Sequence, residues 1–175
     1  MIMTRTLFAS GFAAFFALLL GACQSGATAS HEESGRVTVV FEHPENFTDF
    51  KDSLSGTPRG REDFQYILGK TVREEASRKL KEGERLLVTF TDVDLAGDLF
   101  APESMGGRVR VIKQLYPPRV TLHFKLTDAH GAVLKEGDRR LMDASFMQTT
   151  SAADRDGDLA YDRKLLRDWI KAEFR

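Results

Sequence analysis

The chain has 175 residues, with 25 Lys and Arg against 26 Asp and Glu, so its net charge is close to zero. A nucleic-acid-binding protein would show a strong basic excess or a recognisable module, and the composition shows neither. The single cysteine, Cys23, excludes an intramolecular disulfide. The fold is therefore expected to be stable without a covalent cross-link, and nucleic acid is not an expected partner.

Residues 1–22 have the pattern of a secretory signal peptide. A short polar start with one cation, Arg5, precedes an apolar stretch from Leu7 to Leu20, and small residues follow. A helix that spans a bilayer needs about 20 residues, so this stretch is too short for a permanent transmembrane helix. We therefore expect the leader to be removed.

The lone cysteine follows the leader directly, in the context Leu20-Gly21-Ala22-Cys23. This segment resembles the bacterial lipobox, which implies cleavage before Cys23 and a diacylglyceryl group on its thiol. Two or more acyl chains anchor a protein stably to a membrane. Gln24 stands where an aspartate would imply retention in the inner membrane, so the resemblance implies an outer-membrane lipoprotein that faces the periplasm. The alternative is an ordinary cleaved leader that happens to contain a cysteine.

The remaining chain divides into a tether and one domain. Residues 25–35 are small and polar, which is typical of a flexible linker, so residues 23–35 are predicted to be the lipidated cysteine and its tether. Residues 36–175 are long enough to bury a core of their own and are predicted to form a single domain.

Apolar periodicity predicts five strands and two helices in this domain. The helices are residues 61–82, where apolar residues recur every fourth position, and the segment from about Leu159 to the end. The strands have alternating or β-branched residues and lie at 36–42, 86–93, 108–115, 119–127 and 133–141.

The order of these elements predicts an α+β fold. Four successive strands joined by short turns favour an antiparallel meander, and two one-sided helices can cover only one of its faces. We therefore expect a two-layer sandwich with a mainly antiparallel sheet of about five strands, two helices on one face, and an opposite face exposed to solvent.

Three carboxylates follow the second strand, at Asp92, Asp94 and Asp98. The strand's alternation places the first two on the side of Val88 and Phe90, which is expected to face the core. Ionised carboxylates are too costly to bury there unpaired, so the strand must end, bulge or meet cationic partners at this point.

Two interpretations of these carboxylates remain open. In the favoured one, they form a structural network with the guanidinium groups of Arg108, Arg110 and Arg119. In the other, Asp92, Asp94 and Asp98 bind a divalent metal or work as an acid/base pair in a hydrolase. The first requires no cofactor.

A second acidic segment, residues 154–158, precedes the last helix. It fails as an EF-hand because the sixth and twelfth positions are Leu159 and Leu165 instead of glycine and glutamate. Asp156 or Asp158 is more simply predicted to be the N-cap of the last helix.

Basic residues on two predicted strands form a candidate patch, which could hold an anionic envelope component or an acidic partner. The alternative is a solvated sheet face neutralised by nearby acids. The residues of this patch are Arg108, Arg110, Arg119, His123 and Lys125.

Several segments together resemble a bacterial envelope family known as the domain of unknown function number three thousand and sixteen. The resemblance implies that the aspartate loop and the arginine strand belong to one shared feature, and it implies no activity because the family's function is unassigned. The matching segments lie at residues 44–49, 91–98, 108–113, 116–119, 143–146 and 159–162, together with Trp169.

No catalytic motif stands out in the sequence. We therefore expect a non-catalytic envelope lipoprotein whose domain binds a partner protein or an envelope component. The alternative is a divalent-metal-binding protein or metal-dependent hydrolase that uses the Asp92, Asp94 and Asp98 loop.

Overall fold

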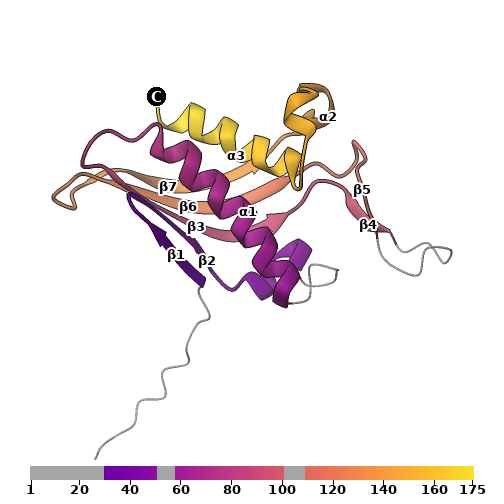
Figure 1. Cartoon of the computed structure of the whole chain (residues 1–175), viewed down its shortest axis with the longest axis horizontal. Coiled ribbons are helices and arrows are strands. Elements are labelled where there is room, and N and C mark those ends of the chain that lie inside the picture. Colours follow the sequence, from indigo (N-terminus) through magenta and orange to yellow (C-terminus); the bar gives the residue numbers. More distant parts are fainter. Residues whose placement is uncertain (1–29, 51–57, 101–108) are drawn as a thin grey trace, which may run out of the picture.

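The computed structural model describes residues 30–50, 58–100 and 109–175. The leader, Cys23, most of the predicted tether and Arg108 lie outside these ranges. The main sheet has five strands in the order β1-β2-β3-β6-β7 (Figure 1). Their bounds are Ser30–Ser34 for β1, Val37–Phe41 for β2, Arg85–Asp94 for β3, Arg119–Thr127 for β6 and Val133–Met142 for β7.

The helices lie on one face of this sheet (Figure 1). Two long helices, α1 (Pro58–Ser77) and α3 (Ala160–Glu173), cover the sheet, and a four-residue helix, α2 (Phe146–Thr149), lies beside the start of α3. The 3₁₀ helices among the described residues are short and span Pro44–Asn46, Thr48–Phe50 and Ala153–Arg155. The predicted two-layer α+β fold is thereby confirmed.

The sheet is mixed where a simple meander was expected. Strand β2 pairs in parallel with β3, whereas the other neighbours in the main sheet are antiparallel. Parallel neighbours need a long crossover, and the 20-residue helix α1 between β2 and β3 supplies it.

The predicted strand at 108–115 does not join the main sheet. Of its described residues, 109–115, only β5 (Val109–Val111) is a strand, and it pairs with β4 (Asp98–Phe100) in a separate two-stranded sheet. We call β4 and β5 the arm; it lies beyond one end of the main sheet (Figure 1). The fifth place in the sheet is taken instead by β1, whose residues composition assigned to the tether.

The core lies between the sheet and the two long helices. The predicted apolar stripe of α1 is buried at Leu68, Val72 and Ala76, and α3 contributes Leu166 and Ile170. Burying a side chain of this size stabilises a fold by about 1.5–3 kcal/mol relative to leaving it exposed. The two helices are therefore held to the sheet mainly by apolar contact.

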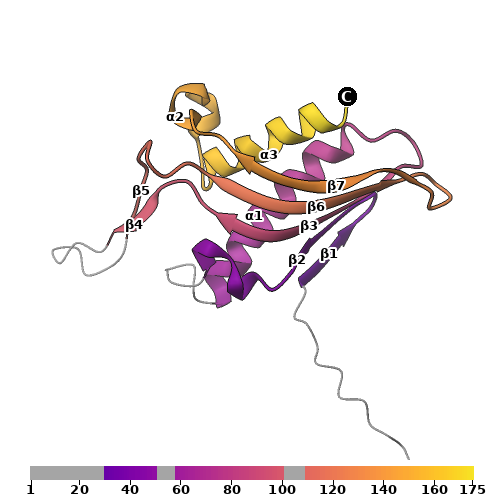
Figure 2. The same ribbon diagram turned by 180° about the vertical axis from the view of Figure 1, so that it is seen from behind.

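No helix of the described residues covers the opposite face of the sheet, as Figure 2 shows. There His123 lies 2.9 Å from Oδ1 of Asp138 and 3.2 Å from Oε1 of Glu136, and these hydrogen bonds raise the pKa of His123. Lys125 also lies 3.9 Å from Glu136. The described cations of the predicted basic patch do not form one basic surface: His123 and Lys125 are matched by acids on β7, Arg119 by Asp94 on β3, and Arg110 lies in the arm.

In the part of the chain that the structure describes, no helix combines the length and apolarity needed to cross a membrane.

Candidate functional site at the end of strand β3

A β-bulge reorients the end of β3. The register with β6 shifts between Phe90 and Asp92, so that one extra residue, Thr91, is inserted. The shift keeps Val93 fully buried and leaves Asp92 and Asp94 beside the β6 residues of the open face. The bulge thus removes the conflict between carboxylates and core that the sequence indicated.

Asp94 and Arg119 are brought together by this register. Nη1 of Arg119 donates to Oδ2 of Asp94 at 2.7 Å. Partial burial nevertheless raises the pKa of Asp94, with the nearby carboxylates of Asp49 and Asp92 acting in the same direction. Because about half of the Arg119 side chain is exposed, this pair contributes little to stability.

Asp92 has a different partner, the 3₁₀ segment that follows β2. Its two carboxylate oxygens accept hydrogen bonds from the backbone N–H and the hydroxyl of Thr48, at 2.7 and 3.0 Å. The next residue, Asp49, accepts the backbone N–H of Leu95 at 2.6 Å. Since Phe47 and Phe50 on either side are buried, this segment is fixed both to the core and to the end of β3.

Arg110 connects the arm to this end of the sheet. Its Nη1 donates to three consecutive backbone carbonyls, those of residues 95–97, at 3.1–3.4 Å. Its Nη2 lies 3.0 Å from Oδ1 of Asp49, and both side chains are largely buried. One guanidinium therefore joins β5, the β3–β4 turn and the 3₁₀ segment.

Asp162, in the first turn of α3, completes the arrangement. Its side chain is only 2% exposed, and Oδ1 accepts the backbone N–H of Ala96 at 3.0 Å. Burial raises the pKa of Asp162 to about 7, although the Ala96 hydrogen bond and the nearby Arg110 favour its charged form. We refer to Asp49, residues 95–97, Arg110 and Asp162 as the Arg110 cluster.

The three predicted carboxylates do not converge on one point. Asp92 is bonded to Thr48 and Asp94 to Arg119, whereas Asp98 lies in the arm and accepts the backbone N–H of the adjacent Leu99 at 2.7 Å. Within residues 30–50, 58–100 and 109–175, no three or more His, Cys, Asp or Glu side chains are grouped to hold a metal ion. The described residues therefore give the metal interpretation no donor set.

Residues 35–172 match a family model described as a protein of unknown function, DUF3016. The chain belongs to the DUF3016 family. No curated protein and no solved structure matches it. The matched region includes the arm and the whole Arg110 cluster, whereas Cys23 precedes it.

The N-cap predicted for the last helix of the DUF3016 domain is wrong. Leu159, with a left-handed φ of 54°, occupies the N-cap position and makes no side-chain capping bond. Asp156 contributes through its backbone carbonyl, which accepts a hydrogen bond from Nη2 of Arg163. The carboxylate that does lie near the positive end of α3 belongs to Asp162, which the helix places toward the β3–β4 turn.

Asp49 and Asp162 are the site residues that the sequence interpretation missed. Both fall within segments that resemble the family, residues 44–49 and 159–162, and this was the signal that pointed to them. Asp162 also lies on the apolar stripe of the last helix, three and four residues before Leu165 and Leu166, which was a further signal of its burial, whereas Asp49 lies in no periodic apolar pattern. Their role depends on contacts across 46 and 66 residues of chain, to Leu95 and Ala96 respectively.

Proposed function

We propose that this DUF3016 protein is a lipid-anchored envelope protein whose domain is a non-catalytic binding or accessory module facing the periplasm. The observation that carries the proposal is the arm and its attachment. Phe100, at the end of β4, is 59% exposed, and Leu115, in the segment that returns from the arm to the sheet, is 75% exposed. Aromatic side chains such as that of Phe100 supply much of the contact energy in protein interfaces.

The attachment of the arm supports this proposal. Burying charged groups costs free energy, and well-packed apolar residues often stabilise a fold as well as a buried ion pair does. Arg110, Asp49 and Asp162 lie at the base of the arm, and their contacts fix its position relative to the sheet. A binding surface on the arm requires such a fixed position.

The β3–β4 turn is also built for a close approach to β5. Gly97 has a left-handed φ of 85°, and a Cβ at this position would lie 2.6 Å from the carbonyl oxygen of Val111. Its N–H donates to the carbonyl of Tyr116 at 2.9 Å. The turn therefore lies against the last residue of β5 and is hydrogen-bonded to the segment that returns toward β6.

The membrane location is supported by the leader alone. Replacing Cys23 with serine removes the thiol that would carry the acyl groups, and Cys23 lies before the matched domain. We expect Cys23→Ser to move the protein from the membrane fraction to the soluble fraction with its melting temperature unchanged. Retention of the variant in the membrane fraction would refute the anchor.

The binding role is tested by photo-crosslinking in cells of the source bacterium. A photoreactive amino acid at Leu115 is expected to give one discrete crosslinked product with an envelope component. The matched control is the same amino acid at Glu62, an exposed position near the start of α1. Equal or no crosslinking at the two positions would contradict the role of the arm.

A further inference from the structure

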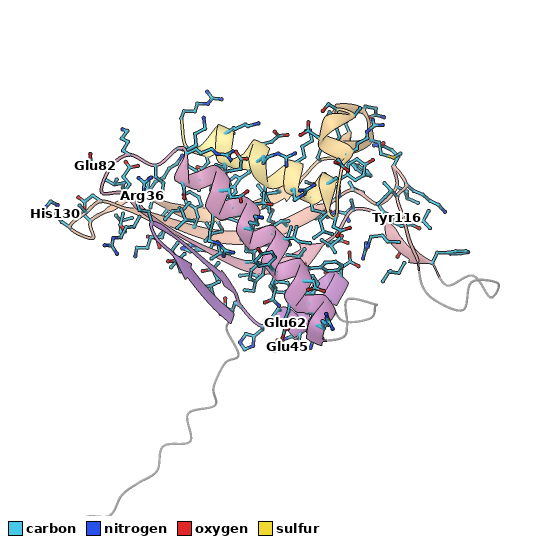
Figure 3. The ribbon with its side chains drawn as sticks, in the orientation of Figure 1. Arg36, Glu45, Glu62, Glu82, Tyr116 and His130 are labelled. Carbon is cyan, nitrogen blue, oxygen red and sulfur yellow. The ribbon has the colours of Figure 1, made fainter. Side chains whose placement is uncertain are left out.

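The end of the domain opposite the arm contains a cavity of about 330 Å³. Figure 3 labels Arg36, Glu82 and His130 at this end and Tyr116 near the arm. The cavity lies between the segment that follows α1, the start of β7 and the end of α3. Its volume is at the lower end of the range of small-molecule sites, about 300–1,000 Å³.

The floor of the cavity is apolar. Leu80, Leu126 and Phe174 line it and are themselves buried. Behind the floor, the ring of Phe174 packs against those of Phe124 and Trp169, with centroids 5.7 and 5.9 Å apart. An apolar group placed on this floor would contact a rigid aromatic cluster.

The rim of the cavity is cationic, and one of its two acids, Glu173, is already paired with cations. Lys79, Lys81 and Lys135 line the rim together with Glu84 and Glu173. Glu173 accepts two hydrogen bonds from Arg139, at 2.7 and 2.8 Å, and these lower the pKa of Glu173 to about 2. Lys135 adds a further contact to the same carboxylate at 2.5 Å.

The two remaining lysines are not needed to compensate the end of α1. The guanidinium of Arg36 donates to the backbone carbonyls of Ser77, Leu80 and Lys81, at 3.0, 3.2 and 2.8 Å. Of these, only the Ser77 carbonyl belongs to the last turn of α1, where the negative end of the helix lies. The Arg36 guanidinium already covers it together with the two carbonyls that follow the helix, so Lys79 and Lys81 add positive charge to the rim.

Lys79 and Lys81 also have no acidic partner in the described residues. Glu84, the nearest rim acid in sequence, directs Oε2 to the backbone N–H of Lys81 at 2.8 Å instead of to an ammonium group. The ion pairs found among residues 30–50, 58–100 and 109–175 include neither lysine. The rim thus has two ammonium groups available to a ligand.

We infer that this cavity binds a small amphipathic anion. Its apolar part lies on Leu80, Leu126 and Phe174, and its carboxylate or phosphate group lies between Lys79 and Lys81. A ligand with both an apolar part and an anionic group would therefore contact the floor and the rim at the same time. Small-molecule sites commonly have this composition, an apolar lining with a few polar groups that fix the orientation of the ligand. The inference goes beyond the proposed binding role of the arm, since the two sites share no residue.

Trp169 is a built-in reporter of this site because it is the only tryptophan of the chain and contacts Phe174 of the floor. The full chain carrying Cys23→Ser, which has no acyl group to occupy the cavity, is titrated with decanoate and with decyl phosphate below their micelle concentrations. Both are expected to change Trp169 fluorescence saturably. Decanol and decyltrimethylammonium are expected to bind about tenfold more weakly or not at all.

The matched variants separate this site from general charge effects. Lys79→Ala with Lys81→Ala is expected to weaken decanoate binding about tenfold. Lys70→Ala with Lys113→Ala removes the same charge from exposed positions elsewhere and is expected to leave the binding unchanged.

Equal weakening in the two double variants would overturn the inference, as would equally tight binding of decanol. A fluorescence response to anionic phospholipid vesicles without a response to decanoate would indicate a membrane-contacting surface in place of the cavity and would also overturn it.

Discussion

Replacing Asp162 with asparagine should remove a specific pH dependence of stability. In the folded protein, burial raises the pKa of Asp162 to about 7, whereas an unfolded aspartate titrates near 3.9. The folded state therefore holds this proton more tightly than the unfolded state. Asparagine is neutral at every pH, and its side-chain oxygen can accept the same N–H of Ala96.

The sign and size of the effect follow from this difference. Between about pH 4 and pH 7 the folded wild-type protein binds more protons at Asp162 than the unfolded chain, so its free energy of unfolding falls as the pH rises. Above pH 7 the contribution is constant. The two pKa values differ by about 3, which corresponds to about 4 kcal/mol as an upper value.

Urea unfolding followed by Trp169 fluorescence between pH 4 and pH 8 measures this effect. The difference in unfolding free energy between Asp162→Asn and the wild type cancels the contributions of other titrating groups. It should grow by several kcal/mol in favour of the variant as the pH rises. Asp158→Asn, an exposed control, should follow the wild type.

A difference that does not change with pH would refute the account of a desolvated carboxyl at Asp162. A wild type that gains stability over Asp162→Asn as the pH rises would show that Arg110 stabilises the charged carboxylate more than burial destabilises it.

Three further substitutions test other contacts by the same unfolding assay. Glu173→Gln removes two hydrogen bonds from Arg139 and should lower the unfolding free energy by about 2–3 kcal/mol at pH 7. This loss should shrink as the pH falls from about 4.5 toward 2, because protonation of Glu173 in this range removes the stabilisation from the wild type as well. A loss of unfolding free energy that does not depend on pH would contradict the ion pair. Arg119→Ala removes a half-exposed pair and should cost no more than about 1 kcal/mol, so a cost above about 2 kcal/mol would be inconsistent with a solvent-screened contact. Gly97→Ala places a Cβ against the backbone of β5 and should cost about 1–3 kcal/mol, more than Gly157→Ala, where a flexible arginine side chain is the neighbour; equal costs would show that the close approach is unimportant.

Strand β6 could be predicted to the residue because four apolar and five polar side chains alternate between a core and an uncovered face. The segment after Arg108 also alternates, but its strand β5 pairs with β4 in the arm and not with the main sheet. Alternation indicates that a strand has two unlike faces, but it does not indicate with which other strand it pairs. For this reason a strand was predicted at residues 108–115, but its predicted place in the main sheet was wrong.

The parallel pairing of β2 with β3 depends on α1, which connects the two strands and packs against β2. A strand, a long helix and a strand in sequence is the arrangement that permits a parallel crossover, so the signal was present. The expectation of a meander followed the short turns later in the chain and overlooked this first crossover.

The candidate site was predictable only in part. The conflict at Asp92 and Asp94 follows from strand alternation, and one expected pair, Asp94 with Arg119, is present. The partners of Arg110 were not predictable, because they are backbone carbonyls and an aspartate in a short 3₁₀ helix without periodic signal. The burial of Asp162 depends likewise on how α3 approaches the β3–β4 turn.

The central claim is that the Arg110 cluster holds the arm in position for a partner. The most direct test is the yield of the crosslinked product from a photoreactive residue at Leu115 when Arg110→Met is introduced, with Arg119→Met as the matched control. The account predicts that the product is lost with Arg110→Met and retained with Arg119→Met, at equal amounts of protein in the membrane fraction. An undiminished product with Arg110→Met would contradict it.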